Sequence, residues 1–158
     1  MTMDTIVMLE EKQGQTHVLF EDMQRKVISM GVNEFLDKLC LGHGGTVKGN
    51  QKAMSVSLNI RQKIPILICR KKRFILYPVT QVSGTKVWIR YLYSQKIKKV
   101  HEYKTRLIYH EQMGIDVDAN VRAVQRQHYR CTDYLAHLDT FERKCAVVAL
   151  TDIKLLLK

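Results

Sequence analysis

Several features typical of secreted, membrane or fibrous proteins are missing from this sequence. It has two prolines and four cysteines in 158 residues, and the cysteines are widely spread without the spacing of a disulfide scaffold. No apolar run reaches the roughly 20 residues that a membrane-spanning helix needs, and residues 1–11 lack the basic start of a signal peptide. We therefore expect one cytoplasmic domain over residues 1–158 that does not associate with membranes.

Catalytic and metal-binding motifs are also missing. Cys40 and His43 have a ligand-like spacing, but no second pair completes a set of four zinc ligands. Gly44 and Gly49 have the spacing of a phosphate-binding loop, yet Asn-Gln follows Gly49 where Lys-Ser/Thr is required. No serine-hydrolase or zinc-protease motif occurs. The sequence therefore predicts a protein that is not an enzyme and needs no metal or cofactor.

What the sequence does contain is a strong and localised positive charge. The formal net charge is +11, and residues 48–106 carry fifteen basic side chains against one acid, Glu102. Such a stretch needs a compensating reason, because like charges held together repel. The commonest partner is nucleic acid, whose phosphates release counterions when they are neutralised. An anionic membrane, which usually recruits a basic helix or tail, and a solvated face without a partner are the alternatives.

The patterning predicts an α+β fold with a mainly antiparallel sheet. The expected strands are short, β-branched or alternating segments separated by glycine-containing or basic turns, at 5–10, 16–20, 64–69, 73–79, 87–93, 96–101 and 104–109. The last two are expected to extend the same sheet. Trp88 is expected in the core, on the opposite side of its strand from Tyr91 and Tyr93. Those two tyrosines could stack single-stranded bases.

A short helix before a glycine loop and a longer C-terminal helix complete the predicted fold. Apolar residues at steps of three and four predict the short helix over 32–41, with Asn33 as its cap, and Gly44–Lys52 is expected to be a flexible loop. The longer helix is predicted over 119–138, capped by Asp118. The apolar tail after Phe141 is expected to pack on the domain or on another subunit, as strand or helix.

The predicted nucleic-acid contacts come from the glycine loop, the basic turn at 70–73, the neighbouring strands and one face of the longer helix. We expect the loop, the turn and the strands to form one positive face. The arginines of the helix recur every four residues and therefore share a side. A solvated face without a partner is an equally strong alternative for them, because these charges could pair locally with acids such as Asp133. The predicted contacts are Lys48, Lys52, Arg61, Lys63, Arg70, Lys71, Lys72, Arg73, Lys86, Arg90, Arg122, Arg126 and Arg130.

The order of motifs in the middle of the chain resembles a known family. The glycine loop is followed by Lys63-Ile64-Pro65-Ile66, then by Phe74-Ile75-Leu76-Tyr77-Pro78, and then by Trp88-Ile89. In this order and spacing, residues 40–135 resemble the ComK family, the competence transcription factors of Gram-positive bacteria. Asn50 departs from the family pattern, which has an arginine there, and Val79 and Val87 replace a threonine and a small residue.

The resemblance implies a transcription activator that binds AT-rich promoter double-stranded DNA and regulates competence or DNA-uptake genes. It also implies a homo-oligomer, help to RNA polymerase, and control by a protease adaptor. An AT-rich site suits a basic protein, because narrow minor grooves concentrate negative potential. Two alternatives stay open: a decoy or interaction protein of the same fold that does not activate promoters, and a protein that binds RNA or single strands.

Overall fold

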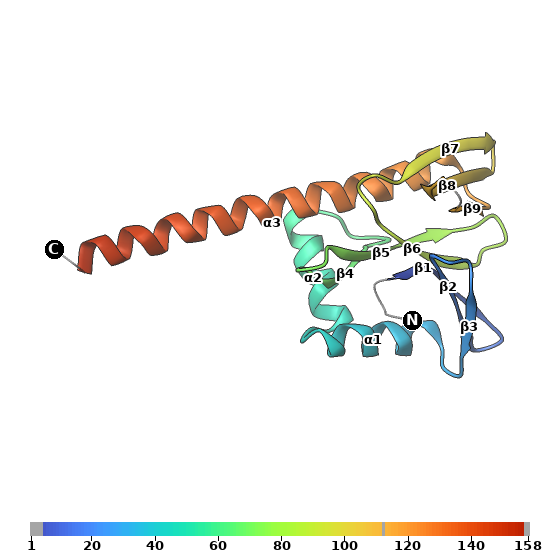
Figure 1. The fold of residues 1–158 in the computed structure, drawn as a ribbon, viewed down its shortest axis with the longest axis horizontal. Helices are drawn as coiled ribbons and strands as arrows, with labels where there is room; N and C mark the ends of the chain where they lie inside the picture. Colours follow the sequence, from blue (N-terminus) through green and yellow to red (C-terminus); the bar gives the residue numbers. More distant parts are fainter. Residues whose placement is uncertain (1–4, 112, 157–158) are drawn as a thin grey trace.

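The computed structural model describes residues 5–111 and 113–156. These residues form a mainly antiparallel six-stranded sheet, a second three-stranded sheet and three helices, the last of which is long and C-terminal (Figure 1). The predicted α+β fold class is therefore confirmed.

The larger sheet, sheet A, has the strand order β3-β2-β1-β6-β5-β4, and all its neighbouring strands are antiparallel. The first hairpin and the strands on either side of the basic turn lie close to where the sequence predicts them. The edge strand β3 is missing from the prediction because its side chains are mostly exposed and show no apolar alternation. The strands of sheet A are β1 (Ile6–Lys12), β2 (Gln15–Phe20), β3 (Arg25–Ile28), β4 (Ile66–Cys69), β5 (Phe74–Thr80) and β6 (Lys86–Arg90).

The second sheet, sheet B, corrects the prediction that the later strands extend sheet A. Its strands pair in the order β7-β8-β9 and are β7 (Lys96–His101), β8 (Lys104–His110) and β9 (Met113–Val117). In β9 buried and exposed residues alternate strictly, which is typical of a strand with one face on a core. The hydrogen-bonding partner of a strand depends on residues distant in sequence, so the strand pattern alone does not reveal which sheet it joins.

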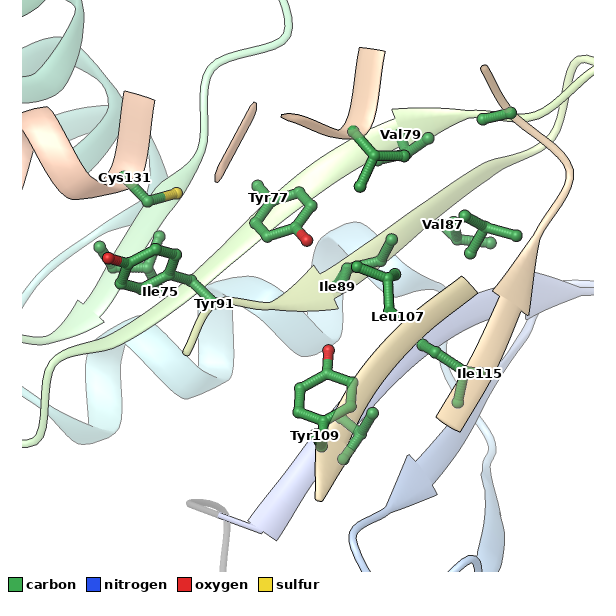
Figure 2. Packing of buried hydrophobic residues seen from close by; sticks show 14 of the residues in the cluster. Ile75, Tyr77, Val79, Val87, Ile89, Tyr91, Leu107, Tyr109, Ile115 and Cys131 are labelled. Carbon is green, nitrogen blue, oxygen red and sulfur yellow. The ribbon is translucent and has the colours of Figure 1, made fainter. Parts of the chain in front are cut away.

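The central strands of sheet A are buried on both faces. On one face, residues of β5 and β6 such as Tyr77 and Ile89 pack against Leu107 and Tyr109 of sheet B and against Cys131 of the last helix (Figure 2). On the other face, the first helix packs its buried side chains against the sheet. Trp88 belongs to this second cluster and is 5% exposed, so the prediction that it lies in the core is confirmed.

The first helix is α1 (Val32–Gly42), and its N-cap is Gly31 rather than the predicted Asn33. Gly31 offers no side chain to the free amides of the first turn. The Glu11 carboxylate at the end of β1 instead accepts a hydrogen bond from the Val32 amide at 2.9 Å. A carboxylate at a helix N-terminus also complements the helix dipole. The capping group therefore comes from a strand distant in sequence.

The segment Gly44–Lys52, predicted as a flexible loop, is largely helical. Helix α2 spans Val47–Leu58, and Thr46 caps it by accepting a hydrogen bond from the Gly49 amide at 3.0 Å. A Cβ atom at Gly49 would lie 2.9 Å from the Thr46 hydroxyl oxygen. An added Cβ atom would force the capping hydroxyl to shift, so this glycine reflects close contact rather than flexibility.

The last helix, α3 (Val121–Leu156), is capped by Asn120 rather than by the predicted Asp118. The Asn120 side-chain oxygen accepts hydrogen bonds from the amides of Arg122 and Ala123 at 2.7 and 3.3 Å. The backbone of Asp118 is occupied elsewhere, since its amide donates to Gln81 and its carbonyl accepts from Val82. The predicted core stripe is confirmed at its centre, where Val124, Cys131 and Leu135 are buried.

Helix α3 continues to Leu156, well beyond the predicted end, so the described part of the tail after Phe141 is helical. Its C-terminal half extends away from the two sheets (Figure 1), and the described side chains from Thr140 to Val147 are exposed. Of the two expectations for the tail, packing on the domain does not hold for Phe141–Val147, and packing on another subunit stays a prediction. Within the described ranges, no helix combines the length and apolarity needed to cross a bilayer.

Candidate nucleic-acid interface

Four of the predicted lysines lie around two adjoining hollows beside α2. One hollow, of about 340 Å³, lies between α1, α2 and residues of β4, β5 and β6, and Lys63 and Lys86 line it. The other, of about 630 Å³, lies against α2 and is lined by Lys48 and Lys52. The two hollows share lining residues, so we treat them as one surface, the α2 groove. Its residues are Asn33, Leu36, Asp37, Thr46, Val47, Lys48, Gly49, Gln51, Lys52, Ser55, Lys63, Ile64, Ile66, Pro78, Lys86 and Trp88.

Carboxylates compensate only a small part of the positive charge of the α2 groove. All four lysines are exposed, and within the described residues none of them forms an ion pair. Asp37 is the one acid among the lining residues. Lys86 lies 5.8 Å from the centroid of the Trp88 ring, a cation–π distance that keeps its ammonium group over the groove wall. The groove therefore presents excess positive charge to a ligand.

The N-terminus of α2 adds to this charge. Thr46, Lys48 and Gly49 line the larger hollow at the first turn of the helix. The aligned peptide dipoles place a partial positive charge at a helix N-terminus, and this end attracts phosphate. No acidic side chain occupies the first turn of α2. A phosphate group at this end would therefore meet both the helix dipole and a lysine.

The two side chains after Gly49 fasten the groove to the sheet. Asn50 donates a hydrogen bond to the Leu67 carbonyl at 2.9 Å, and its amide nitrogen lies 3.6 Å from the Cys40 sulfur. Gln51 donates to the Ile64 carbonyl at 2.9 Å. Burial raises the pKa of the Cys40 thiol above its ordinary value, so this cysteine stays protonated. Asn50 therefore joins α2 to β4 and is not oriented as a base-reading side chain.

The basic turn at 70–73 does not carry four unpaired charges as predicted. Arg70 pairs with Glu142 at 2.7 Å and donates to the Leu138 carbonyl, while Arg73 pairs with Asp139 at 2.8 Å. The hydrogen bond from Arg73 to Asp139 raises the pKa of the guanidinium group. The acids of α3 therefore already occupy the arginines of the turn. Lys71 and Lys72 of the turn are exposed.

Arg90, another predicted contact, is 7% exposed and faces the core. Its guanidinium carbon lies 4.4 Å from the centroid of the Phe74 ring. The carbonyl of Arg90 accepts hydrogen bonds from the Tyr109 hydroxyl at 2.9 Å and from the Gln95 amide at 3.3 Å. Stacking on an aromatic face is a common way for arginine to bury its charge. Arg90 is therefore excluded from the candidate surface.

The arginine row of α3 is interrupted. Arg122 and Arg126 are exposed, but Arg130 is half-buried and donates to the carbonyls of Gln62 and Lys63 at 3.0 and 3.3 Å. Burial lowers the pKa of the Arg130 guanidinium, and the nearby Arg126 charge acts in the same direction. Asp133, the expected local partner, forms no ion pair with this row within the described residues. Arg61 is exposed and lies in the same loop as Lys63, between α2 and β4.

Only one of the two tyrosines predicted to stack bases, Tyr91 and Tyr93, has an exposed ring. Tyr91 is buried, and its hydroxyl lies 2.8 Å from the Thr132 hydroxyl, so its ring cannot stack a base. Burial raises the pKa of Tyr91 above its usual range. Tyr93 is 81% exposed. Because β6 ends at Arg90, the strand alternation that placed the two tyrosines on one side does not apply.

Sequence reasoning missed the polar residues that shape the α2 groove. Thr46 and Gln51 are uncharged and sit in a segment predicted to be a loop. Gln127 lies on α3, far from the groove in sequence. The spacing of Thr46 and Gly49 is the one local signal that could have revealed a capped helix, because threonine is a preferred N-cap residue.

Two comparisons gave no match and one did. A family model described as ComK protein matches residues 1–142. No curated protein and no solved structure matches the chain. The family match extends beyond the motifs at 40–135 on which the resemblance was based, and includes both sheets and residues 121–142 of α3.

Proposed function

The chain belongs to the ComK family, and from this premise we propose that it is a transcription regulator that binds double-stranded DNA through the α2 groove. The observation that carries the proposal is the group of four lysines, Lys48, Lys52, Lys63 and Lys86, which line one groove without ion-pair partners within the described residues. A duplex supplies phosphates at regular spacing, and each phosphate neutralised by a lysine releases counterions.

In this proposal the lysines position the duplex and DNA shape supplies the preference. Lysine contacts to phosphate carry no sequence information. AT-rich tracts have a narrow minor groove with enhanced negative potential, which attracts arginine. Arg61, Arg122 and Arg126 are exposed arginines available for such a contact. We therefore propose AT-rich promoter DNA as the target, with activation of competence or DNA-uptake genes as the outcome.

Several further proposals follow from the family. The protein acts in the cytoplasm, as one DNA-binding domain over residues 1–158, without catalysing a reaction. It forms a homo-oligomer and contacts RNA polymerase and a protease adaptor. The projecting half of α3, with Phe141 and Val147 exposed, offers accessible surface for protein partners.

The test is a competition between an AT-rich duplex, a GC-rich duplex and a single strand, each at two salt concentrations. We expect the AT-rich duplex to bind best. If the four lysines each neutralise one phosphate, the log–log slope of affinity against salt is about −3.6. A preference for single strands would overturn the proposal in favour of single-strand or RNA binding. Binding without salt dependence would exclude the α2 groove as the DNA-binding surface.

The matched variants are Lys48→Gln with Lys52→Gln in the groove, and Arg25→Gln with Lys26→Gln as a control. The control residues are exposed on β3, at the opposite edge of sheet A from β4, and remove the same charge. We expect the groove variant to reduce the slope by about 1.8 and the control to leave it unchanged. An equal effect of both variants would show that only net charge matters.

A further inference from the structure

We propose that Gln127 of α3 is a positioning residue for the α2 groove, and that together with Arg130 it holds Lys63 in place for binding. The inference rests on the proposed function of the groove as a DNA contact. The arginine row of α3 was expected to contact phosphates. In this inference Arg130 instead holds a loop of the protein that carries Lys63.

The first evidence is the hydrogen bonding of Gln127. Its side chain is 4% exposed, and its amide nitrogen donates to the carbonyls of Lys63 at 2.8 Å and Pro78 at 2.7 Å. Both of these residues line the α2 groove. One buried amide group therefore joins the loop that carries Lys63 to strand β5, which forms the groove wall.

The second evidence is Arg130, which completes the network. Its Nη1 atom donates to the carbonyls of Gln62 and Lys63, and to the Gln127 side-chain oxygen at 3.1 Å. The two donors and the acceptor of Gln127 are thereby all used. Buried polar groups are nearly always hydrogen-bonded, and a carbonyl that loses its partner inside the protein is costly. The loop is therefore strongly held by α3.

The third evidence is the backbone of Lys63 itself. Its φ angle is +52°, in the left-handed region that side chains other than glycine rarely adopt. Such a conformation persists only when surrounding contacts hold it. The loop between α2 and β4 also contains Asn59 at φ +53°, where α2 ends. Two hydrogen bonds from α3 to the Lys63 carbonyl supply the contacts that this conformation requires.

Loss of the network should therefore act on binding through Lys63. Without Gln127, the Lys63 carbonyl keeps only the longer hydrogen bond from Arg130, at 3.3 Å, and the loop loses its link to β5. The loop can then leave the left-handed conformation, and the Lys63 ammonium group is no longer held at the groove. The groove would then keep three of its four lysines in place. The effect of removing Gln127 should equal that of removing the Lys63 charge, and the two changes should not add.

The experiment is a double-mutant cycle with Gln127→Met and Lys63→Gln, measured as affinity for an AT-rich duplex at several salt concentrations. Methionine keeps the length of the side chain and removes both donors. Gln125→Met is the matched control, since Gln125 is exposed on the same helix. Each variant should first show the helical content of the wild type by circular dichroism.

We expect Gln127→Met and Lys63→Gln each to reduce the slope of log affinity against log salt by about 0.9, and the double variant to do no more. Over a fourfold increase in salt, each variant should therefore lose about 3.5-fold less affinity than the wild type loses. Full additivity of the two changes, or an unchanged slope in Gln127→Met, would overturn the inference.

Limited trypsin digestion gives a readout that does not depend on DNA. Trypsin cuts after Arg61 and Lys63, and Gln127→Met should accelerate these cuts relative to cuts after Arg25 and Lys26 on β3. Unchanged relative cleavage overturns the positioning role whatever the DNA result. If the wild type binds no duplex while the loop cuts still accelerate, the proposed function fails and the link between α3 and the loop stands.

Discussion

The ion pairs between α3 and the basic turn lead to a quantitative prediction about DNA affinity. Arg73 pairs with Asp139 at 2.8 Å, so an Asp139→Asn variant releases the Arg73 positive charge from the negative charge that neutralises it. Asp133→Asn is a close control, because Asp133 is exposed on the same helix and forms no ion pair within the described residues. The two substitutions change the net charge equally and differ in the release of Arg73.

The stability cost of this release should be small. The Arg73 and Asp139 side chains are both more than a third exposed, and an exposed ion pair contributes about 0–1 kcal/mol after solvent screening. For a chain of this size, about 1 kcal/mol corresponds to a decrease in Tm of about 2–4 °C. The variant should therefore remain folded at the temperature of the binding assay.

The effect on binding follows from counterion release. If the turn contacts the duplex, a released Arg73 adds about one phosphate contact and steepens the salt slope by about 0.9. The assay is fluorescence anisotropy with a labelled AT-rich duplex at four or more salt concentrations. Asp133→Asn should raise affinity at low salt only slightly and leave the slope unchanged. Equal slopes for the two variants would refute the reasoning and place the turn outside the DNA contact.

Two further predictions concern stability. Gly49→Ala should destabilise the protein, since the added Cβ atom lies 2.9 Å from the Thr46 hydroxyl and disturbs a cap whose loss costs about 1 kcal/mol. The control Gly42→Ala meets no atom within 4 Å and should be neutral or stabilising. Urea unfolding measures both, and equal free energies of unfolding for the two variants would contradict the cap. The hydrogen bond from Arg106 lowers the pKa of Asp116, so its stabilising contribution is present above the ordinary aspartate pKa of about 3.9 and is lost as the pH falls through the lowered value. Asp116→Asn should therefore lower Tm at pH 7 and lose its effect in strong acid; an effect independent of pH would exclude this ion pair.

The agreement between the sequence-based predictions and the structure differs between the fold and the candidate site. The strands around the basic turn follow from β-branched patterning, because side-chain alternation is a local property of the chain. The identity of sheet B was not predicted, because the pairing of β7 with β8 and β9 rather than with sheet A is a long-range choice. Helix α2 was missed because Gly49 was interpreted as flexible.

The amino-acid sequence alone determined the excess of positive charge, its concentration in residues 48–106, and the local periodicities that make an α+β fold. The tertiary structure decided which charges remain available to a ligand. Arg70 and Arg73 pair with acids that follow them by more than sixty residues, Arg90 stacks in the core, and Arg130 holds a loop. A charge is a property of one side chain, but its compensation depends on which distant groups folding brings within a few ångströms.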